Sequence, residues 1–154
     1  MSVLENALTR EVDLISRFLV VLEKEQEALQ NAQPEALTPL LDSKTSLVDQ
    51  LNALESERIK LVGGSSGLSD KERMQAWLAT HPAEKRIAAL WNKLIELALS
   101  AKTQSELNST LVKLHMERTA KALAILTRHT QENTLYGSNG QASVYTGSRI
   151  VDSA

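Results

Sequence analysis

The chain contains three histidines and no cysteine, so histidines are its main candidates for catalysis or metal binding. Without cysteine it can form no disulfide, no thiolate nucleophile and no cysteine-ligated metal site. His115 and His129 are about 21 Å apart along one predicted helix, so they cannot share a metal ion. His81 precedes Pro82 and is predicted to mark a helix boundary. We therefore predict no catalytic residue, no metal and no cofactor.

Two segments match part of a motif of known chemistry but lack the rest of it. His115, in KLHMERTAKA, could be the phospho-accepting histidine of a four-helix phosphotransfer module, but the Lys-Gly sequel expected there is missing. The glycine-rich segment Gly63-Gly64-Ser-Ser-Gly67 is followed by no GK[ST], which indicates a flexible loop and not a phosphate loop. Phosphotransfer stays open as a less favoured alternative, and the sequence otherwise predicts a protein that is not an enzyme.

The overall charge and hydropathy exclude other classes of protein. The chain has 154 residues and a net charge of −2, without the basic excess typical of nucleic-acid binders. Its longest uncharged apolar run, residues 18–22, is far too short to span a bilayer, and the first residues do not form a signal peptide. We expect a cytoplasmic protein that binds no nucleic acid and does not insert stably into a membrane.

The elements that position these residues are predicted to be helices. Aromatic residues are only 3% of the chain, whereas the strong helix formers leucine and alanine are abundant. Glycine and proline divide the chain into helices at about 3–31, 34–62, 70–80 and 82–134 and a non-helical tail, 135–154. Residues 34–38 could form a separate turn. The predicted fold class is an all-α antiparallel helical bundle or coiled-coil hairpin, with residues 1–134 as one domain and 135–154 as a flexible tail.

The first predicted helix carries two apolar stripes. One stripe is heptad-like, with Glu11 and Glu25 in its gaps, and the other repeats every seven residues. The first contains Leu4, Leu8, Ile15, Phe18, Leu22 and Leu29, and the second contains Ala7, Leu14, Val21 and Ala28. So wide an apolar surface predicts that this helix contacts two neighbours. The short connection after it predicts an antiparallel second helix.

Charge is sorted along the chain. Residues 1–33 carry a net −3, residues 34–62 a net −2 and residues 83–134 a net +3. This distribution favours docking of the acidic hairpin against the basic last helix over pairing within the hairpin. The alternative is that these charges only solvate the outer faces of the helices.

The last predicted helix is too long for the first two helices to cover. At 1.5 Å per residue it measures about 78 Å, against about 40 Å for each of the others. The uncovered half carries Leu107, Leu111, Leu114, Leu123, Ile125 and Leu126. So large an apolar stripe predicts self-association, back-folding or a groove for a partner helix. Alternatively, the helix breaks near residues 100–109 and closes a four-helix bundle.

The C-terminal segment resembles that of a known family. The matching stretches are Leu107-Asn108-Ser-Thr-Leu111-Val112, Leu135-Tyr136-Gly137-Ser-Asn-Gly140-Gln141 and Ser148-Arg149-Ile150-Val151-Asp152. The Asn-x-x-Leu-Val step and the Tyr-Gly-x-x-Gly-Gln motif are the specific part of the match. By these motifs and its order of helices, the chain resembles the FlgN family of flagellar export chaperones over essentially its whole length.

The resemblance implies a function. Members are non-enzymatic cytoplasmic proteins that bind the C-terminal helical region of flagellar hook–filament junction proteins, prevent their premature assembly and deliver them to the flagellar type III export apparatus. The resemblance also implies that the end of the last helix and the segment after it bind the client, and that Tyr136 docks to the export gate. The alternative that the residues leave open is a self-associating coiled-coil scaffold or regulatory adaptor, in which the exposed stripe forms a homodimer.

Overall fold

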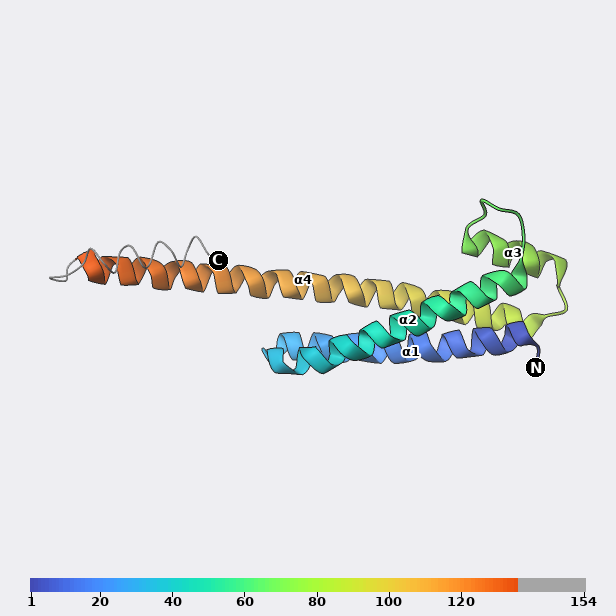
Figure 1. Cartoon of the computed structure of the whole chain (residues 1–154), viewed down its shortest axis with the longest axis horizontal. Helices are drawn as coiled ribbons and strands as arrows, with labels where there is room; N and C mark the ends of the chain where they lie inside the picture. Colours follow the sequence, from blue (N-terminus) through green and yellow to red (C-terminus); the bar gives the residue numbers. More distant parts are fainter. Residues whose placement is uncertain (136–154) are drawn as a thin grey trace. The chain divides into compact units, whose positions relative to one another are not determined.

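The computed structural model describes residues 1–135, with side chains as far as Gln131, and those residues are helical apart from short connections (Figure 1). The elements are α1 (Val3–Gln30), the 3₁₀ helix η1 (Pro34–Ala36), α2 (Leu37–Val62), α3 (Asp70–Thr80) and α4 (Lys85–Leu135). No strand occurs in this part of the chain, and the predicted all-α bundle is confirmed. Leu135, predicted to open the tail, still belongs to α4; the other predicted tail residues, 136–154, lie outside the described part.

Two helices begin later than the sequence predicted. Pro34 opens η1, so that α2 starts only at Leu37, in agreement with the separate turn considered for residues 34–38. The residues around Pro82 form a tight connection in which the Glu84 N–H donates to the His81 carbonyl, and α4 starts at Lys85. His81 is the C-cap of α3, as predicted for a boundary residue.

Helix α4 is unbroken from Lys85 to Leu135, so the predicted alternative of a break at residues 100–109 is wrong. The low helix propensity of that stretch is overridden by contacts with α1. Gln104 donates to the Gln26 side chain, and Asn108 donates to the Leu22 carbonyl. Contacts with α1 thus hold residues 100–109 in the helix.

The chain divides into two compact units, Met1–Ser109 and Thr110–Ala154. The first contains α1, η1, α2, α3 and the first part of α4, and the second is described as the helix from Thr110 to Leu135. The division into one helical domain, 1–134, and a flexible tail stays a prediction.

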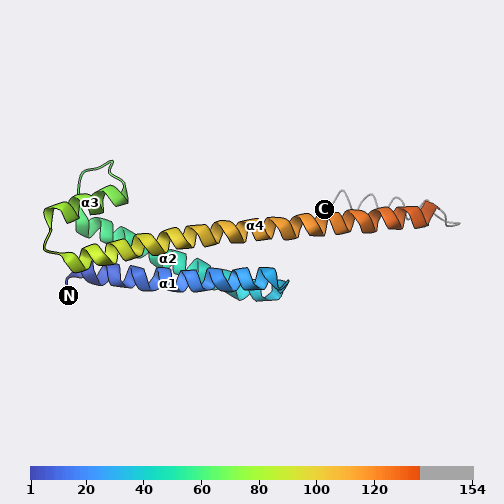
Figure 2. The same cartoon turned by 180° about the vertical axis from the view of Figure 1, so that it is seen from behind.

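Within the first unit, α1 packs along two neighbours, α2 and the first part of α4, as its two stripes predicted (Figure 2). One stripe shares a cluster with the first part of α4 that also includes Met74 of α3, and the other packs against α2. The first cluster comprises Leu4, Leu8, Ile15, Leu22, Met74, Ile87, Trp91, Leu94 and Ala101, and the second Leu14, Leu47 and Leu54. Burial of these side chains is the main favourable contribution to the bundle.

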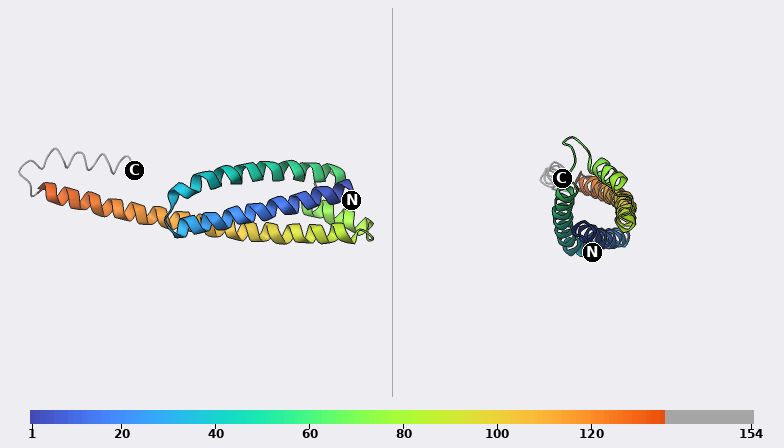
Figure 3. Two further views of the ribbon diagram at one scale, coloured as in Figure 1. Left: turned by 90° about the horizontal axis from the view of Figure 1, so that it is seen from below. Right: turned by 90° about the vertical axis from the view of Figure 1, so that its right-hand side faces the viewer.

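Polar contacts show the direction of each helix in this unit. Glu25 near the end of α1 pairs with Lys44 near the start of α2, while Glu11 pairs with Arg58, so α1 and α2 are antiparallel. Glu5 pairs with Arg86, and the Leu22 carbonyl accepts from Asn108, so α4 runs parallel to α1 here. Figure 3 shows these three helices packed together in the first unit.

The charge pattern predicted one of two helix pairings. The acidic hairpin does dock against α4, since α1 packs on it and Glu5 pairs with Arg86. The expected preference over pairing within the hairpin is wrong, because Glu25–Lys44 and Glu11–Arg58 join α1 to α2. Of these pairs only Glu11–Arg58 is fully buried, and the partly exposed pairs contribute little free energy. The apolar stripes therefore determine which helices pack together, and the net charge of each segment does not.

The loop after α2 is built from specific backbone chemistry. Gly63 caps α2 with φ +68°, a conformation that favours glycine, and its carbonyl accepts from the Arg73 side chain at 2.9 Å. The predicted capping box opens α3: the Ser69 hydroxyl accepts from the Glu72 N–H, and the Glu72 carboxylate accepts from the Ser69 N–H. These contacts fix where α3 begins and bring Asp70 next to α2.

Candidate functional site

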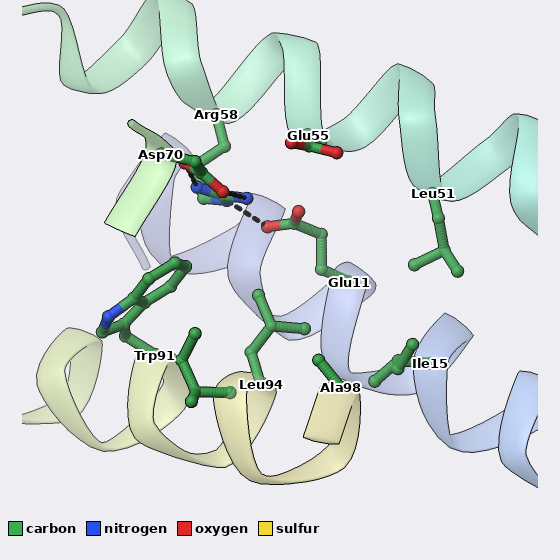
Figure 4. Close-up of a pocket in the computed structure, with 10 residues that line it drawn as sticks. Glu11, Ile15, Leu51, Glu55, Arg58, Asp70, Trp91, Leu94 and Ala98 are labelled. Atoms are coloured by element: carbon green, nitrogen blue, oxygen red, sulfur yellow. Dashed lines mark hydrogen bonds and ion pairs between the residues drawn. The ribbon is translucent and has the colours of Figure 1, made fainter. Parts of the chain in front are cut away.

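A buried guanidinium forms polar contacts between the helices of the first unit (Figure 4). The Arg58 side chain of α2 is only 3% exposed. Its Nε donates to Glu11 Oε2 of α1 at 2.7 Å, its Nη2 donates to Asp70 Oδ2 of α3 at 2.8 Å, and Nη1 donates to Asp70 Oδ1. Its Cζ lies 5.0 Å from the ring centroid of Trp91 of α4. One side chain thus contacts α1, α3 and α4.

The electrostatics of this cluster follow from one cation facing two carboxylates. Burial raises the pKa of Glu11, and the hydrogen bond and charge of Arg58 lower it only in part. Burial alone would lower the pKa of Arg58, but its hydrogen bonds to Asp70 and Glu11 outweigh that effect and hold the pKa above its ordinary value. Arg58 is therefore charged throughout the physiological range, and the cluster carries an excess of negative charge.

An open cavity of about 220 Å³ adjoins the cluster between α1, α2 and α4 (Figure 4). Its apolar wall includes Ile15, Leu51 and Leu94. Glu55 and the Arg58 cluster form its polar wall. The groups of the lining that could act as a base or nucleophile are the carboxylates of Glu11, Glu55 and Asp70, and Arg58 binds two of them. We therefore assign the cluster to the stability of the bundle.

A second buried polar contact lies at the end of the first unit. Asn108 is 3% exposed. Its Nδ2 donates to the Leu22 carbonyl at 2.8 Å and to Glu25 Oε1 at 3.0 Å, and its Oδ1 accepts from Gln104 at 3.0 Å. The Glu25 carboxylate also pairs with Lys44 of α2. This network joins three helices and fixes the position of α4 along α1.

Neither the Arg58 cluster nor Asn108 was predicted as a site, although the sequence contains a pattern that points to each. Glu11 fills a gap in the apolar stripe of α1, and Arg58 lies between Leu54 and Leu61 in the stripe of α2. A charged residue at a seam position on each of two antiparallel helices indicates a buried ion pair. Asn108 is the asparagine of the Asn-x-x-Leu-Val step. Its hydrogen bonds to Leu22, Glu25 and Gln104 explain why an asparagine is found there.

The predicted client-binding residues lie on α4, Leu107 in the first unit and the other five in the second. Leu111 is half-buried. The remaining predicted residues are exposed, with accessible fractions from 38% to 65%: Leu107, Leu114, Leu123, Ile125 and Leu126. Val112 and Met116, which were not predicted, are exposed as well. The described part of the second unit therefore presents a large apolar surface to solvent.

These apolar residues fall on two sides of the helix. Successive residues turn by about 100°, which places Leu107, Leu111, Leu114 and Ile125 on one side, the Leu111 face. Leu123 and Leu126 lie with Val112 and Met116 on another side, the Met116 face, roughly 140° away. The six predicted residues therefore do not share one face. In α1 two such stripes are covered by two neighbours; here both are exposed.

Basic residues accompany the exposed surface. Residues 110–131 contain Lys113, Arg118, Lys121 and Arg128 against a single acid, Glu117, and all five side chains are exposed. Arg118 falls within the Leu111 face, between Leu111 and Ile125 around the helix, and Lys121 and Arg128 lie along its edge. Lys113 lies well away from that face.

Other predicted features are placed as follows. Tyr136 lies outside the described residues. His115 is half-buried on α4, and its backbone carbonyl accepts from Thr119. In the described part of the chain, no three histidine and carboxylate side chains gather in a way that could hold a metal ion. None of the described helices combines the length and hydropathy needed to cross a membrane.

Comparison with known proteins gives one consistent result. A family model described as "FlgN protein" matches residues 1–143. Two curated relatives named "Flagella synthesis protein FlgN" are 28% identical: that of Yersinia enterocolitica, covering 90% of this chain and 88% of the relative, and that of Salmonella typhimurium strain LT2, covering 94% and 93%. No solved structure matches the chain.

Proposed function

The chain belongs to the FlgN family of flagellar synthesis proteins, which is not an enzyme family, and from that premise we propose that it is an export chaperone. Its clients are hook–filament junction proteins, whose C-terminal helical region it binds in the cytoplasm. Binding prevents their premature assembly, and the complex delivers them to the flagellar type III export apparatus. We propose further that residues 1–134 act as one helical domain with a flexible tail.

The observation that carries this proposal is the exposed apolar surface of the second unit. A surface of this kind on a helix is suited to adding a partner helix, with anchors spaced along one side. Each leucine or isoleucine that a client buries contributes roughly 1.5–3 kcal/mol before the entropic costs of association. Several such anchors suffice for micromolar or tighter binding.

Single aspartate substitutions test the surface. We expect Leu114→Asp or Leu123→Asp, whichever lies on the face that the client covers, to weaken binding of a junction protein's C-terminal segment by at least about a hundredfold, because it places a charge in an apolar interface. Ala124→Asp is the matched control, since Ala124 is exposed on the polar side of the same helix. Binding is measured by isothermal titration calorimetry, with circular dichroism to show that the helices remain folded.

The outcome distinguishes the faces. Loss in only one leucine variant would assign the client to that face. Unchanged affinity in both variants would overturn client binding on α4 as proposed.

Docking to the export gate is assigned to Tyr136 on the strength of the family resemblance. We expect Tyr136→Ala to lower secretion of the junction proteins while leaving client affinity unchanged, and Tyr136→Phe to retain most secretion. Secretion is measured in culture supernatants, and affinity with the purified chain. A large loss of client affinity in Tyr136→Ala would move this residue into the client site.

Self-association is the second candidate, because the same exposed surface could pair with a second copy. Sedimentation velocity over a wide concentration range separates the two functions. A tight dimer that the client does not dissociate favours the scaffold. A monomer, or a weak dimer that the client displaces, is what mass action predicts for a chaperone.

A further inference from the structure

The charges on the Leu111 face restrict what can bind there. Arg118 lies within this face and is exposed, as are Lys121 and Arg128 along its edge. A helix that covers the face removes the Arg118 guanidinium from water, and a buried cation is tolerated only with a hydrogen-bonded counter-charge. An apolar partner without acidic groups would leave that charge unpaired.

The bundle already uses this arrangement once. Arg58 occupies a position in the apolar stripe of α2, and its guanidinium is satisfied by Glu11 of the neighbouring α1 and by Asp70. Arg118 occupies the equivalent kind of position on α4. The difference is that Arg118 is exposed.

Resting on the proposed function, we propose that the partner helix on the Leu111 face is acidic and amphipathic. Its apolar side packs on Leu111, Leu114 and Ile125, and its carboxylates pair with Arg118 and with Lys121 and Arg128. The last two are about two helical turns apart, a spacing at which a continuous partner helix places one carboxylate beside each.

Charge also argues against a second copy as the occupant of this face. Two copies packed through it would bring Arg118, Lys121 and Arg128 of each chain together, with two acids, Glu117 and Glu132, between residues 110 and 135 to offset them. The basic residues still outnumber the acidic ones over residues 110–135, and like-charge contacts of this kind disfavour a pairing and thereby give specificity. Homodimerisation, if it occurs, should use the Met116 face.

Two synthetic peptides test the proposal with the full-length chain. They share one leucine-rich helical face and differ only at the flanking positions, which are glutamate in one peptide and lysine in the other. We expect the acidic peptide to bind about tenfold or more tightly, as judged by fluorescence anisotropy, and to weaken as salt is raised. Equal affinities, or no binding of either peptide, would overturn the proposal.

Charge reversal supplies the matched comparison. Arg118→Glu combined with Lys121→Glu should abolish or invert the preference for the acidic peptide. Lys113→Glu makes the same change of charge on the same helix away from the face, and should leave the preference intact. Because all three residues are exposed, none of these changes removes a core contact. A preference that survives the double reversal would contradict the proposal.

A parallel titration with the C-terminal segment of a junction protein separates this inference from the proposed function. If that segment binds and is lost in Leu114→Asp, but the two peptides bind equally, the acidic partner is wrong and the chaperone function stands. If the acidic peptide is preferred and the junction segment does not bind, the proposal of an acidic partner helix stands. The proposed junction-protein client is then wrong, and the partner is another protein.

Discussion

Arg58 joins three other helices to α2 through a charge that has almost no access to water. Its two carboxylate partners come from α1 and α3, and its guanidinium faces the Trp91 ring. Replacing such a cluster by apolar groups of similar volume is often neutral, whereas removing one member alone is costly because the rest stays buried without a partner. Arg58 and Glu11 should therefore behave as a unit.

We expect Arg58→Met to lower the free energy of unfolding by about 3–5 kcal/mol, because Glu11 is left buried and unpaired. Arg58→Lys should lose less, since a single ammonium retains the charge but not the bidentate contact with Asp70. Urea unfolding followed by circular dichroism measures both. Combining Arg58→Met with Glu11→Leu should recover much of the loss, and a double variant no more stable than Arg58→Met would contradict this account.

The raised pKa of Glu11 predicts a dependence of stability on pH. A carboxyl whose pKa is higher in the folded protein than its ordinary 4.5 favours the folded state when protonated. Its contribution is therefore lost as pH rises from below 4.5 through the folded-state pKa. Glu11→Gln cannot titrate, so its stability relative to the unsubstituted protein should rise over that range.

Chemical denaturation from pH 4 to pH 8 checks this difference, with the exposed Glu57→Gln as a control that should show no trend. A difference that moves the opposite way would mean that Arg58 dominates and that the pKa of Glu11 is lowered on folding.

Among the elements, α4 has two kinds of surroundings along its length. Up to Asn108 its side chains pack in the first unit, and the described residues after Ser109 present two apolar faces to solvent. Asn108 forms the last buried contact with α1. A polar group at such a position specifies one register between two helices, because any shift would leave it buried without its hydrogen bonds.

We expect Asn108→Ala to lower the free energy of unfolding by about 1–3 kcal/mol, because Gln104 and Glu25 lose a buried partner. Asn108→Asp should cost more, since it places a second carboxylate beside Glu25. Thermal and urea unfolding measure both variants. The exposed Gln50→Ala, which removes hydrogen bonds within one helix only, is the control. A change in Asn108→Ala no larger than in that control would show that Asn108 does not fix the register.

On the scale of the whole molecule, the two units differ both in net charge and in how much apolar surface they expose. Residues 1–109 carry 12 basic and 16 acidic side chains, a net −4, whereas residues 110–135 carry four basic and two acidic, a net +2. The first unit has buried clusters, and the described helix of the second unit has mostly exposed side chains. Few buried contacts imply a low free energy of local opening.

Hydrogen exchange should report this division directly. We expect the backbone amides of residues 110–135 to exchange faster than those of the buried clusters in the free protein, and to become protected when a junction protein's C-terminal segment is added. Mass spectrometry of peptic fragments measures both states. Strong protection in the free protein that the client does not change would indicate that self-association covers these faces, and would favour the scaffold.

The sequence by itself determined the helices and the local chemistry that starts and ends them. Its composition and its glycine and proline positions predicted an all-α fold, the Ser69–Glu72 capping box predicted the start of α3, and the two stripes of α1 predicted two neighbours. All of these follow from interactions between residues close in the chain or from helical periodicity, which one sequence displays in full.

Only the tertiary structure decided what depends on contacts between distant segments. It showed that Arg58 pairs with Glu11 and Asp70, that Asn108 hydrogen-bonds to α1, and that α4 continues through residues 100–109. It also showed that the hairpin forms ion pairs within itself. Such pairings depend on which side chains packing brings together and removes from water, and the net charge or propensity of a segment does not specify them.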